Sequence, residues 1–108
     1  MSTPLQWERE LVDFTRRNAG RETMLEIDEP ALGAQRQETA YPLRGVAYDR
    51  HDGRVEIMFG AERGMRHHLT HSIPGVRSVD VLRGLDGRDL VLRIEYRGGQ
   101  ALLRLKEA

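Results

Sequence analysis

Three tight-turn dipeptides in the second half of the chain constrain its fold more than any other feature. Asp52-Gly53, Asp86-Gly87 and Gly98-Gly99 each separate two short runs of alternating apolar and polar residues. Such dipeptides supply the positive φ angles that two-residue type I′ hairpin turns require. Strands joined by these turns must be antiparallel, because parallel neighbours need a long crossover. The second half is therefore predicted to be an antiparallel meander without a βαβ unit.

The N-terminal segment, about residues 3–19, is predicted to be a helix. Thr3 is placed to cap it, Pro4 occupies the first helical position, and Gln6 completes a capping box. An apolar stripe at helical spacing follows, formed by Trp7, Leu11 and Phe14. Gly20 is a natural stop, because glycine readily adopts the left-handed conformation that ends a helix.

Residues 21–106 are predicted to form the antiparallel sheet. The polar segment 34–41 is a candidate edge strand, and a bulge at Gly45 would put Leu43, Val46 and Tyr48 on one face. Residues 61–75 lack alternation and are expected to be a longer loop. The predicted core consists of Trp7, Leu11, Phe14, Leu25, Ile27, Val46, Val55, Ile57, Phe59, Val79, Val81, Leu90, Leu92, Ile94, Leu103 and Leu105.

The fold class that follows is α+β. One helix packs on a twisted antiparallel meander, which either stays open or partly closes into a barrel. A length of 108 residues suits a single domain spanning 1–108. Met24, Met58 and Leu82 would lie on the face opposite the core, where alternation predicts polar residues. These residues indicate a second buried surface, such as that of a homodimer.

Composition excludes several classes of function. The chain has no cysteine, which excludes disulfide frameworks, thiolate metal sites and cysteine nucleophiles. No apolar run reaches the roughly 18 residues of a membrane span, and no signal peptide is visible, so we expect a cytoplasmic protein without a membrane partner. The formal net charge is zero, which disfavours nucleic acid as a partner.

Arginine supplies every basic residue except Lys106. One interpretation is bidentate recognition of carboxylate or phosphate. The other, which we favour, is a coding preference for arginine, because the arginines are spread along the chain and interleaved acids suggest surface ion pairs.

Several short motifs follow one another in a characteristic order. They are the helix with Trp7 and Phe14, then Gly20-Arg21, Leu32-Gly33-Ala34-Gln35, Pro42-Leu43-Arg44-Gly45-Val46-Ala47-Tyr48-Asp49, Val55-Glu56-Ile57, and His68-Leu69-Thr70-His71 with Ile73. Their order, from about Trp7 to Leu105, resembles an uncharacterised bacterial family, domain of unknown function 5335. The resemblance implies a stand-alone bacterial domain and favours a role for the histidine segment, but it brings no activity, substrate or catalytic residue.

His67, His68 and His71 are the candidate metal ligands, because imidazole is the commonest ligand for divalent transition metals. On a strand, His67 and His71 would lie roughly 13 Å apart, whereas in a helical turn they could share one ion. A third ligand from elsewhere would come from Asp49, His51 or Glu56. The zincin pattern needs Glu directly after the first histidine, and this position holds His68.

The sequence contains no convincing catalytic arrangement. Thr70 and Ser72 neighbour histidines in sequence, but the members of a catalytic triad normally come from separated segments. Asp49, Asp52 and Glu56 lie in or beside a predicted turn, where acidic residues are common. We therefore expect a non-enzymatic binding or oligomerisation domain that self-associates or binds a protein. The alternative is a small metal-binding protein that uses the His67, His68 and His71 cluster.

Overall fold

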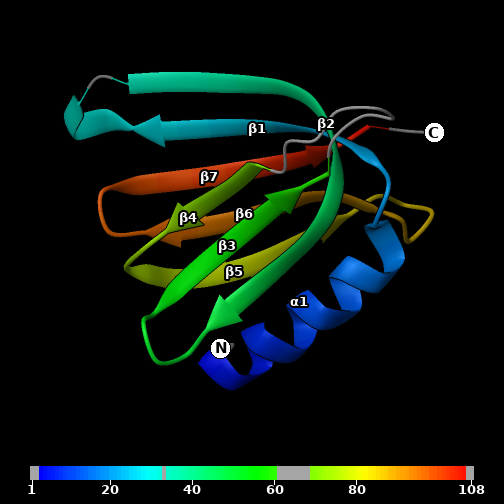
Figure 1. Ribbon diagram of the computed structural model, residues 1–108, viewed down its shortest axis with the longest axis horizontal. Helices are drawn as coiled ribbons and strands as arrows, with labels where there is room; N and C mark the ends of the chain where they lie inside the picture. The colour runs from blue at the N-terminus through cyan, green and yellow to red at the C-terminus, as the bar shows by residue number, and fades with distance from the viewer. Residues whose placement is uncertain (1–2, 33, 61–68, 107–108) are drawn as a thin grey trace.

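In the computed structural model, which describes residues 3–32, 34–60 and 69–106, one α-helix precedes seven strands of an antiparallel sheet (Figure 1). This arrangement confirms the predicted α+β class. The helix α1 spans Pro4–Asn18 and begins with the predicted capping box between Thr3 and Gln6. It ends beside Gly20, whose φ is 90°. Among the described residues, no helix has the length and apolar character that crossing a bilayer requires.

The strands form two meanders that meet in the middle of the sheet. Their order is β4-β3-β2-β1-β7-β6-β5, so the β1–β7 pair joins the first meander to the second. Every neighbouring pair is antiparallel. The bounds are β1 Glu22–Glu29, β2 Ala34–Asp49, β3 Arg54–Phe59, β4 Leu69–Ile73, β5 Val76–Arg83, β6 Asp89–Tyr96 and β7 Gly99–Leu105, with a short 3₁₀ helix, η1, at Pro30–Leu32.

The long strand β2 changes its partner halfway along. Residues 34–42 pair with β1, whereas Leu43–Asp49 pair with β3. The register with β3 skips Arg44, which confirms the bulge predicted near Gly45. Because of this bulge, Leu43 and Val46 are both buried. Within the described pairings, residues 34–42 contact only β1, so this half of β2 is an edge, as its polar sequence indicated.

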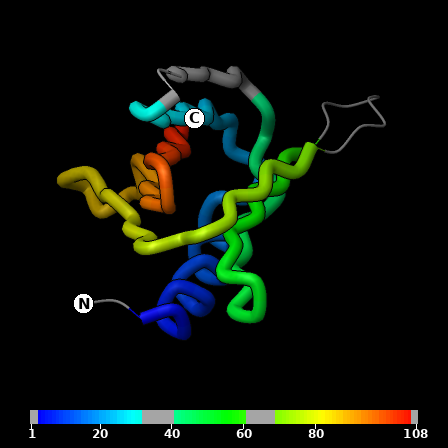
Figure 2. Tube along the Cα trace, turned by 90° about the vertical axis from the view of Figure 1, so that its left-hand side faces the viewer, coloured from blue at the N-terminus to red at the C-terminus, as the bar shows by residue number. Residues whose placement is uncertain are grey.

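The two outermost strands, β4 and β5, are consecutive in the chain. Only Pro74 and Gly75 separate them. Neighbouring strands lie roughly 4.8 Å apart, so two residues cannot cross a flat seven-stranded sheet. The sheet therefore curls until its two edges approach each other at this end (Figure 2). The described parts of β4 and β5 do not pair, so the sheet is not closed into a barrel.

The core lies between α1 and the inner face of the curled sheet, and most residues predicted for it are buried. Ile27 and Val81 are only partly buried and pack against it. The additional members are Leu43, Ile73, Tyr96 and Ala101.

The prediction for Leu90 was wrong, because 38% of this residue is exposed. In the pairing of β5 with β6, Leu82 is opposite Val91 and Arg83 is opposite Asp89. Leu90 is therefore the extra residue of a bulge, and the residue before it takes the inward position. Asp89, which is 4% exposed, is buried in its place.

The connections differ from the prediction in two places. Residues 50–53 and 84–88 form longer turns than the two-residue turns expected, whereas Arg97 and Gly98 do form a two-residue turn. The segment 61–75 was expected to be a loop, but β4 occupies residues 69–73 of it. Residues 61–68 lie outside the described part of the chain.

The helix is fastened to the bulged part of β2. Thr15 Oγ1 donates to Val46 O at 3.1 Å and accepts from Val46 N at 2.9 Å. Gly45 permits this approach, because a Cβ there would lie 3.2 Å from Thr15 Cγ2. At the other end of the helix, the rings of Trp7 and Tyr48 meet edge to face with centroids 5.3 Å apart.

Candidate functional site

The structure describes only part of the predicted histidine site. His67 and His68 lie outside the described residues, and His71 is a partly buried residue of β4 that pairs with β3. Asp49, considered as a third ligand, accepts a hydrogen bond from the backbone N of His51 within the β2–β3 turn. In the described part of the chain, no three His, Asp or Glu side chains gather as metal ligands would. The metal site stays a prediction.

A different cluster forms where the end of α1 meets the β5–β6 hairpin. Asp89, the first residue of β6, lies at its centre, turned inward by the bulge at Leu90. The groups around it come from α1, from the segment between α1 and β1, from β5 and from the turn between β5 and β6. We call this group the arginine cluster, and its members are Arg17, Asn18, Arg21, Arg83, Arg88 and Asp89.

Both carboxylate oxygens of Asp89 accept hydrogen bonds. Oδ2 accepts from Arg17 Nε at 2.8 Å and from Asn18 Nδ2 at 2.6 Å, and Oδ1 accepts from Arg83 Nε at 3.0 Å. Arg21 Nη1 donates to Asn18 Oδ1 at 3.0 Å and to the backbone O of Asp89 at 3.1 Å. The side chain of Asp89 is only 2% exposed, whereas those of Arg17 and Arg83 are 42% and 46% exposed, so half-exposed guanidinium groups hold a buried carboxylate.

The charges around Asp89 decide its protonation state. Burial by itself would raise the pKa of Asp89. The hydrogen bonds from Arg17, Asn18 and Arg83, together with the positive charge of Arg17, outweigh burial and hold this pKa below its ordinary value of 3.8. Asp89 is therefore ionised at neutral pH and is a weak base.

Positive charge is in excess at the arginine cluster. Arg17 and Arg83 bond the carboxylate of Asp89, and Arg21 and Arg88 add two further guanidinium groups to the cluster. Four positive charges thus accompany one negative charge, an excess of three. Asp86 in the adjoining turn carries one negative charge and reduces the excess to two. Its Oδ1 accepts a hydrogen bond from the backbone N of Arg88 at 3.0 Å. The cluster is thus locally basic within a chain of zero net charge.

A cavity of about 240 Å³ lies at the arginine cluster. Within the described part of the chain, two of its donors lack partners. Arg21 Nε is buried without a hydrogen bond, and the guanidinium of Arg88 makes neither a hydrogen bond nor an ion pair. Because Arg21 Nε is buried, the unused donors that a ligand could reach are those of the exposed Arg88. Its lining consists of Arg17, Asn18, Arg21, Gly87, Arg88 and Asp89.

The sequence analysis did not identify this cluster. Arg17 and Asp89 lie 72 residues apart, so only the fold brings them together. The abundance of arginine was the one available signal, and it was interpreted as surface ion pairing. Such pairs do occur elsewhere, for example between Arg104 Nε and Glu26 Oε1 at 2.8 Å.

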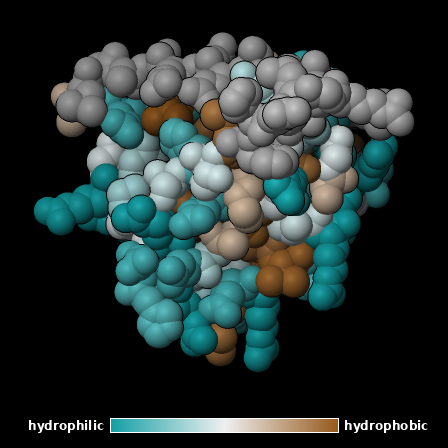
Figure 3. Space-filling model, in the orientation of Figure 1, coloured by the Kyte–Doolittle hydropathy of each residue, from teal (hydrophilic) through white to brown (hydrophobic). Residues whose placement is uncertain are grey.

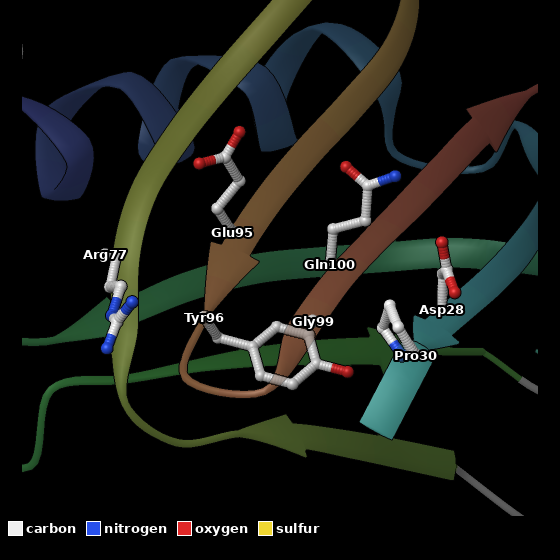
Figure 4. A pocket seen from close by; sticks show the side chains of 7 residues that line it. All are labelled: Asp28, Pro30, Arg77, Glu95, Tyr96, Gly99 and Gln100. Atoms are coloured by element: carbon white, nitrogen blue, oxygen red, sulfur yellow. The ribbon is translucent and has the colours of Figure 1, made fainter. Parts of the chain in front are cut away.

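A second cavity, of about 270 Å³, lies at the opposite end of β6 (Figure 4). Here Tyr96 donates its hydroxyl hydrogen to Glu29 Oε1 at 2.7 Å. Burial, this bond and the charges of Glu29 and Asp28 raise the pKa of Tyr96 above its ordinary value of 10.0. In Figure 4 the Tyr96 ring lies across Gly99 toward Pro30. This contact links β6 to β1, and the hydroxyl of Tyr96 already has its partner within the protein. The arginine cluster, which has an unpaired guanidinium, is therefore the stronger candidate site.

Comparison with known proteins agrees with the motif order. The model of a family of unknown function, DUF5335, matches residues 4–108, which confirms the resemblance noted from the sequence. No curated protein and no solved structure gives a significant match to the chain.

Proposed function

Since the chain belongs to the DUF5335 family of unknown function, its membership supplies no activity, and we propose a function from the geometry instead: the protein is a non-enzymatic domain that binds a small oxyanion, a phosphate or a carboxylate, at the arginine cluster. One observation carries the proposal. Exposed Arg88, whose guanidinium has no partner among the described residues, lies at a cavity that is also lined by Arg17 and Arg21.

The chemistry of the lining supports binding over catalysis. Guanidinium groups present forked donors that match the geometry of phosphate and carboxylate oxygens. Asp89 would be the only carboxylate in the lining available as a base, but three donors already occupy it and its pKa is lowered. A carboxylate held in this way can orient the arginines but is a poor general base.

Asp89 also prepares the site for an anion. Its carboxylate occupies the Nε atoms of Arg17 and Arg83, and each arginine keeps its two terminal nitrogens. An arginine held through Nε loses less rotational freedom when it binds a ligand, because its side chain is already ordered in the folded protein. The entropy lost on binding is therefore smaller.

A phosphate titration tests the proposal. Amide spectra of ¹⁵N-labelled protein, recorded at constant ionic strength with inorganic phosphate, are expected to show saturable shifts at Gly87 and Arg88. The substitution Arg88→Gln should weaken binding by about tenfold, because a charge-assisted hydrogen bond contributes roughly 1.5 kcal/mol.

Arg97→Gln is the matched control, because Arg97 is an exposed arginine in the turn at the other end of β6. It should bind phosphate as the wild type does. Shifts that grow linearly without saturation, or an Arg88→Gln affinity equal to that of the wild type, would show that the cluster is only a structural link.

Self-association stays a separate prediction. The edge strand β5 has register shifts between Val76 and Ser78 and between Leu82 and Arg83, and irregularities of this kind disfavour strand addition at that edge. The free half of β2, residues 34–42, is the better candidate edge. Light scattering on a sizing column measures the oligomeric state directly.

A further inference from the structure

Three exposed leucines lie at the end of the β5–β6 hairpin, next to the arginine cluster. Leu82 is 42% exposed, Leu90 is 38% exposed, and Leu85 in the turn is fully exposed. We call these three residues the apolar tip. Figures 1 and 2 both place the turn between β5 and β6 at the periphery of the molecule. Figure 3, in the orientation of Figure 1, shows a mainly hydrophilic face with a compact hydrophobic patch right of its centre.

The bulge in β6 separates the leucines from the arginines. Asp89 is buried with Arg83 bonded to it, whereas Leu90 is exposed. Leu90 also lies close to Gly84, since a Cβ there would be 3.3 Å from Leu90 Cδ1. The same hairpin end therefore combines exposed leucines with the exposed arginines Arg83 and Arg88.

The exposure of Leu85 shows that the tip is convex. A fully exposed residue projects from the surface, and the described residues form no groove around it. The only carboxylate in the turn, Asp86, has one oxygen bonded to the backbone N of Arg88. A projecting leucine beside the unpaired guanidinium of Arg88 and the half-exposed guanidinium of Arg83, which is bonded to Asp89, is suited to a layer that is anionic outside and apolar beneath.

We propose that the β5–β6 hairpin docks on the surface of an anionic lipid bilayer, with the apolar tip entering the interface and Arg83 and Arg88 contacting lipid phosphates. The energetics are those of interfacial binding, in which buried apolar area adds to attraction by anionic headgroups. The inference rests on the proposed function, because the lipid phosphate is the oxyanion that the arginine cluster would bind.

Two other partners fit this surface less well. A peptide would need a groove or a regular strand edge, but the tip is convex and the edge of β5 is irregular at both ends. A nucleic acid would gain from aromatic faces on which bases stack, but the apolar tip contains only leucines. The expectation of no membrane partner rested on the absence of a long apolar run, which concerns spanning and not surface contact.

Vesicle sedimentation tests the proposal with the intact chain. We expect binding to vesicles that contain about 30% phosphatidylglycerol in phosphatidylcholine, little binding to phosphatidylcholine alone, and weaker binding as salt is raised. Leu85→Ser should weaken binding about tenfold. Leu69→Ser is the matched control, because Leu69 is 45% exposed on β4, at the opposite edge of the sheet.

The outcomes separate this inference from the proposed function. If Leu85→Ser loses vesicle binding and keeps the phosphate shifts at Gly87 and Arg88, both proposals are supported. If the protein binds phosphate but not vesicles, or if Leu85→Ser binds vesicles as the wild type does, the proposal that the hairpin docks on lipid is wrong. The proposed anion site is unaffected by either result. Equal binding to a short DNA duplex by the wild type and by Leu85→Ser would also overturn it. If phosphate fails to bind, the proposed function fails by its own measurement.

Discussion

At the scale of single residues, the carboxylate of Asp89 fastens the end of α1 to the β5–β6 hairpin. Its oxygens satisfy Arg17, Asn18 and Arg83, and Asn18 is itself 2% exposed. A buried amide, such as that of Asn18, that loses its acceptor costs more than the hydrogen bond contributed. The ionised form of Asp89 therefore matters to stability as well as to the proposed site.

The lowered pKa of Asp89 predicts sensitivity to acid. Because the folded pKa lies below the ordinary value of 3.8, the contribution of Asp89 to stability is complete above that value. It is lost as the pH falls through the folded pKa, where the native carboxylate takes up a proton. Urea unfolding measured between about pH 2 and pH 6 should show a steeper loss for the wild type than for Asp89→Asn. Parallel profiles would contradict this assignment.

The inward position of Asp89 could not be predicted from its own strand. The apolar alternation of Leu92, Ile94 and Tyr96, extended backward, puts Leu90 on the inner face and Asp89 outside. A one-residue bulge reverses that order. Because Leu90 is apolar, the alternation of apolar residues in the sequence continues through the bulge and does not reveal it.

At the scale of elements, α1 docks on β2 through polar as well as apolar contacts. Thr15 Oγ1 is both donor and acceptor to the backbone of Val46, at the bulge where β2 would otherwise leave these groups unpaired. The stripe formed by Trp7, Leu11 and Phe14 is buried on the same side of the helix. The single hydroxyl thus fixes where along β2 the helix sits.

Thr15→Val tests this contact, because valine keeps the shape of threonine and removes its hydroxyl. Val46 N and O would lose their partner in a partly buried position, so the free energy of unfolding should fall by about 2 kcal/mol. Urea unfolding followed by circular dichroism measures the change. Thr70→Val, at an exposed position of β4, should change stability by less than about 0.5 kcal/mol. Equal effects of the two substitutions would show that the hydroxyl of Thr15 contributes nothing specific.

Local sequence predicted the elements that carry their own signal. The capping box of α1 and the glycine-bearing turns are specified by neighbouring residues, so the helix and the hairpins were found. The strand β4 was missed, because Leu69-Thr70-His71-Ser72 shows no apolar alternation and gains its structure from pairing with β3. The arginine cluster was missed for the same reason on a larger scale, since its members meet only through the fold.

At the scale of the whole molecule, the two meanders meet at the pairing of β1 with β7. Leu103 of β7 is fully buried and lies opposite Leu25 of β1 on one side and Leu92 of β6 on the other. It is part of the junction between the half of the sheet that carries α1 and the half that carries the β5–β6 hairpin. A destabilising substitution at this position should therefore destabilise both halves of the sheet.

Leu103→Ala tests whether the chain unfolds as the single domain that its length predicts. Truncating a buried leucine should lower the free energy of unfolding by about 3 kcal/mol. Trp7 fluorescence reports on the half with α1, and hydrogen exchange at Val79 and Ile94 reports on the other half. The free energies of unfolding that the two probes report should fall by the same amount. Faster exchange in β6 with an unchanged Trp7 transition would reveal two independent units.

The place of β7 in the sheet has a consequence for synthesis on the ribosome. This strand is translated after the other six but lies between β1 and β6. Until residues 99–105 have left the exit tunnel, the nascent chain has an unpaired edge on each of those two strands. Pairing β1 with β7 brings together residues as distant as Thr23 and Leu105, and contacts of such sequence separation form slowly. The newly made protein therefore passes through a stage in which the middle of its sheet, and not its rim, is open to other chains.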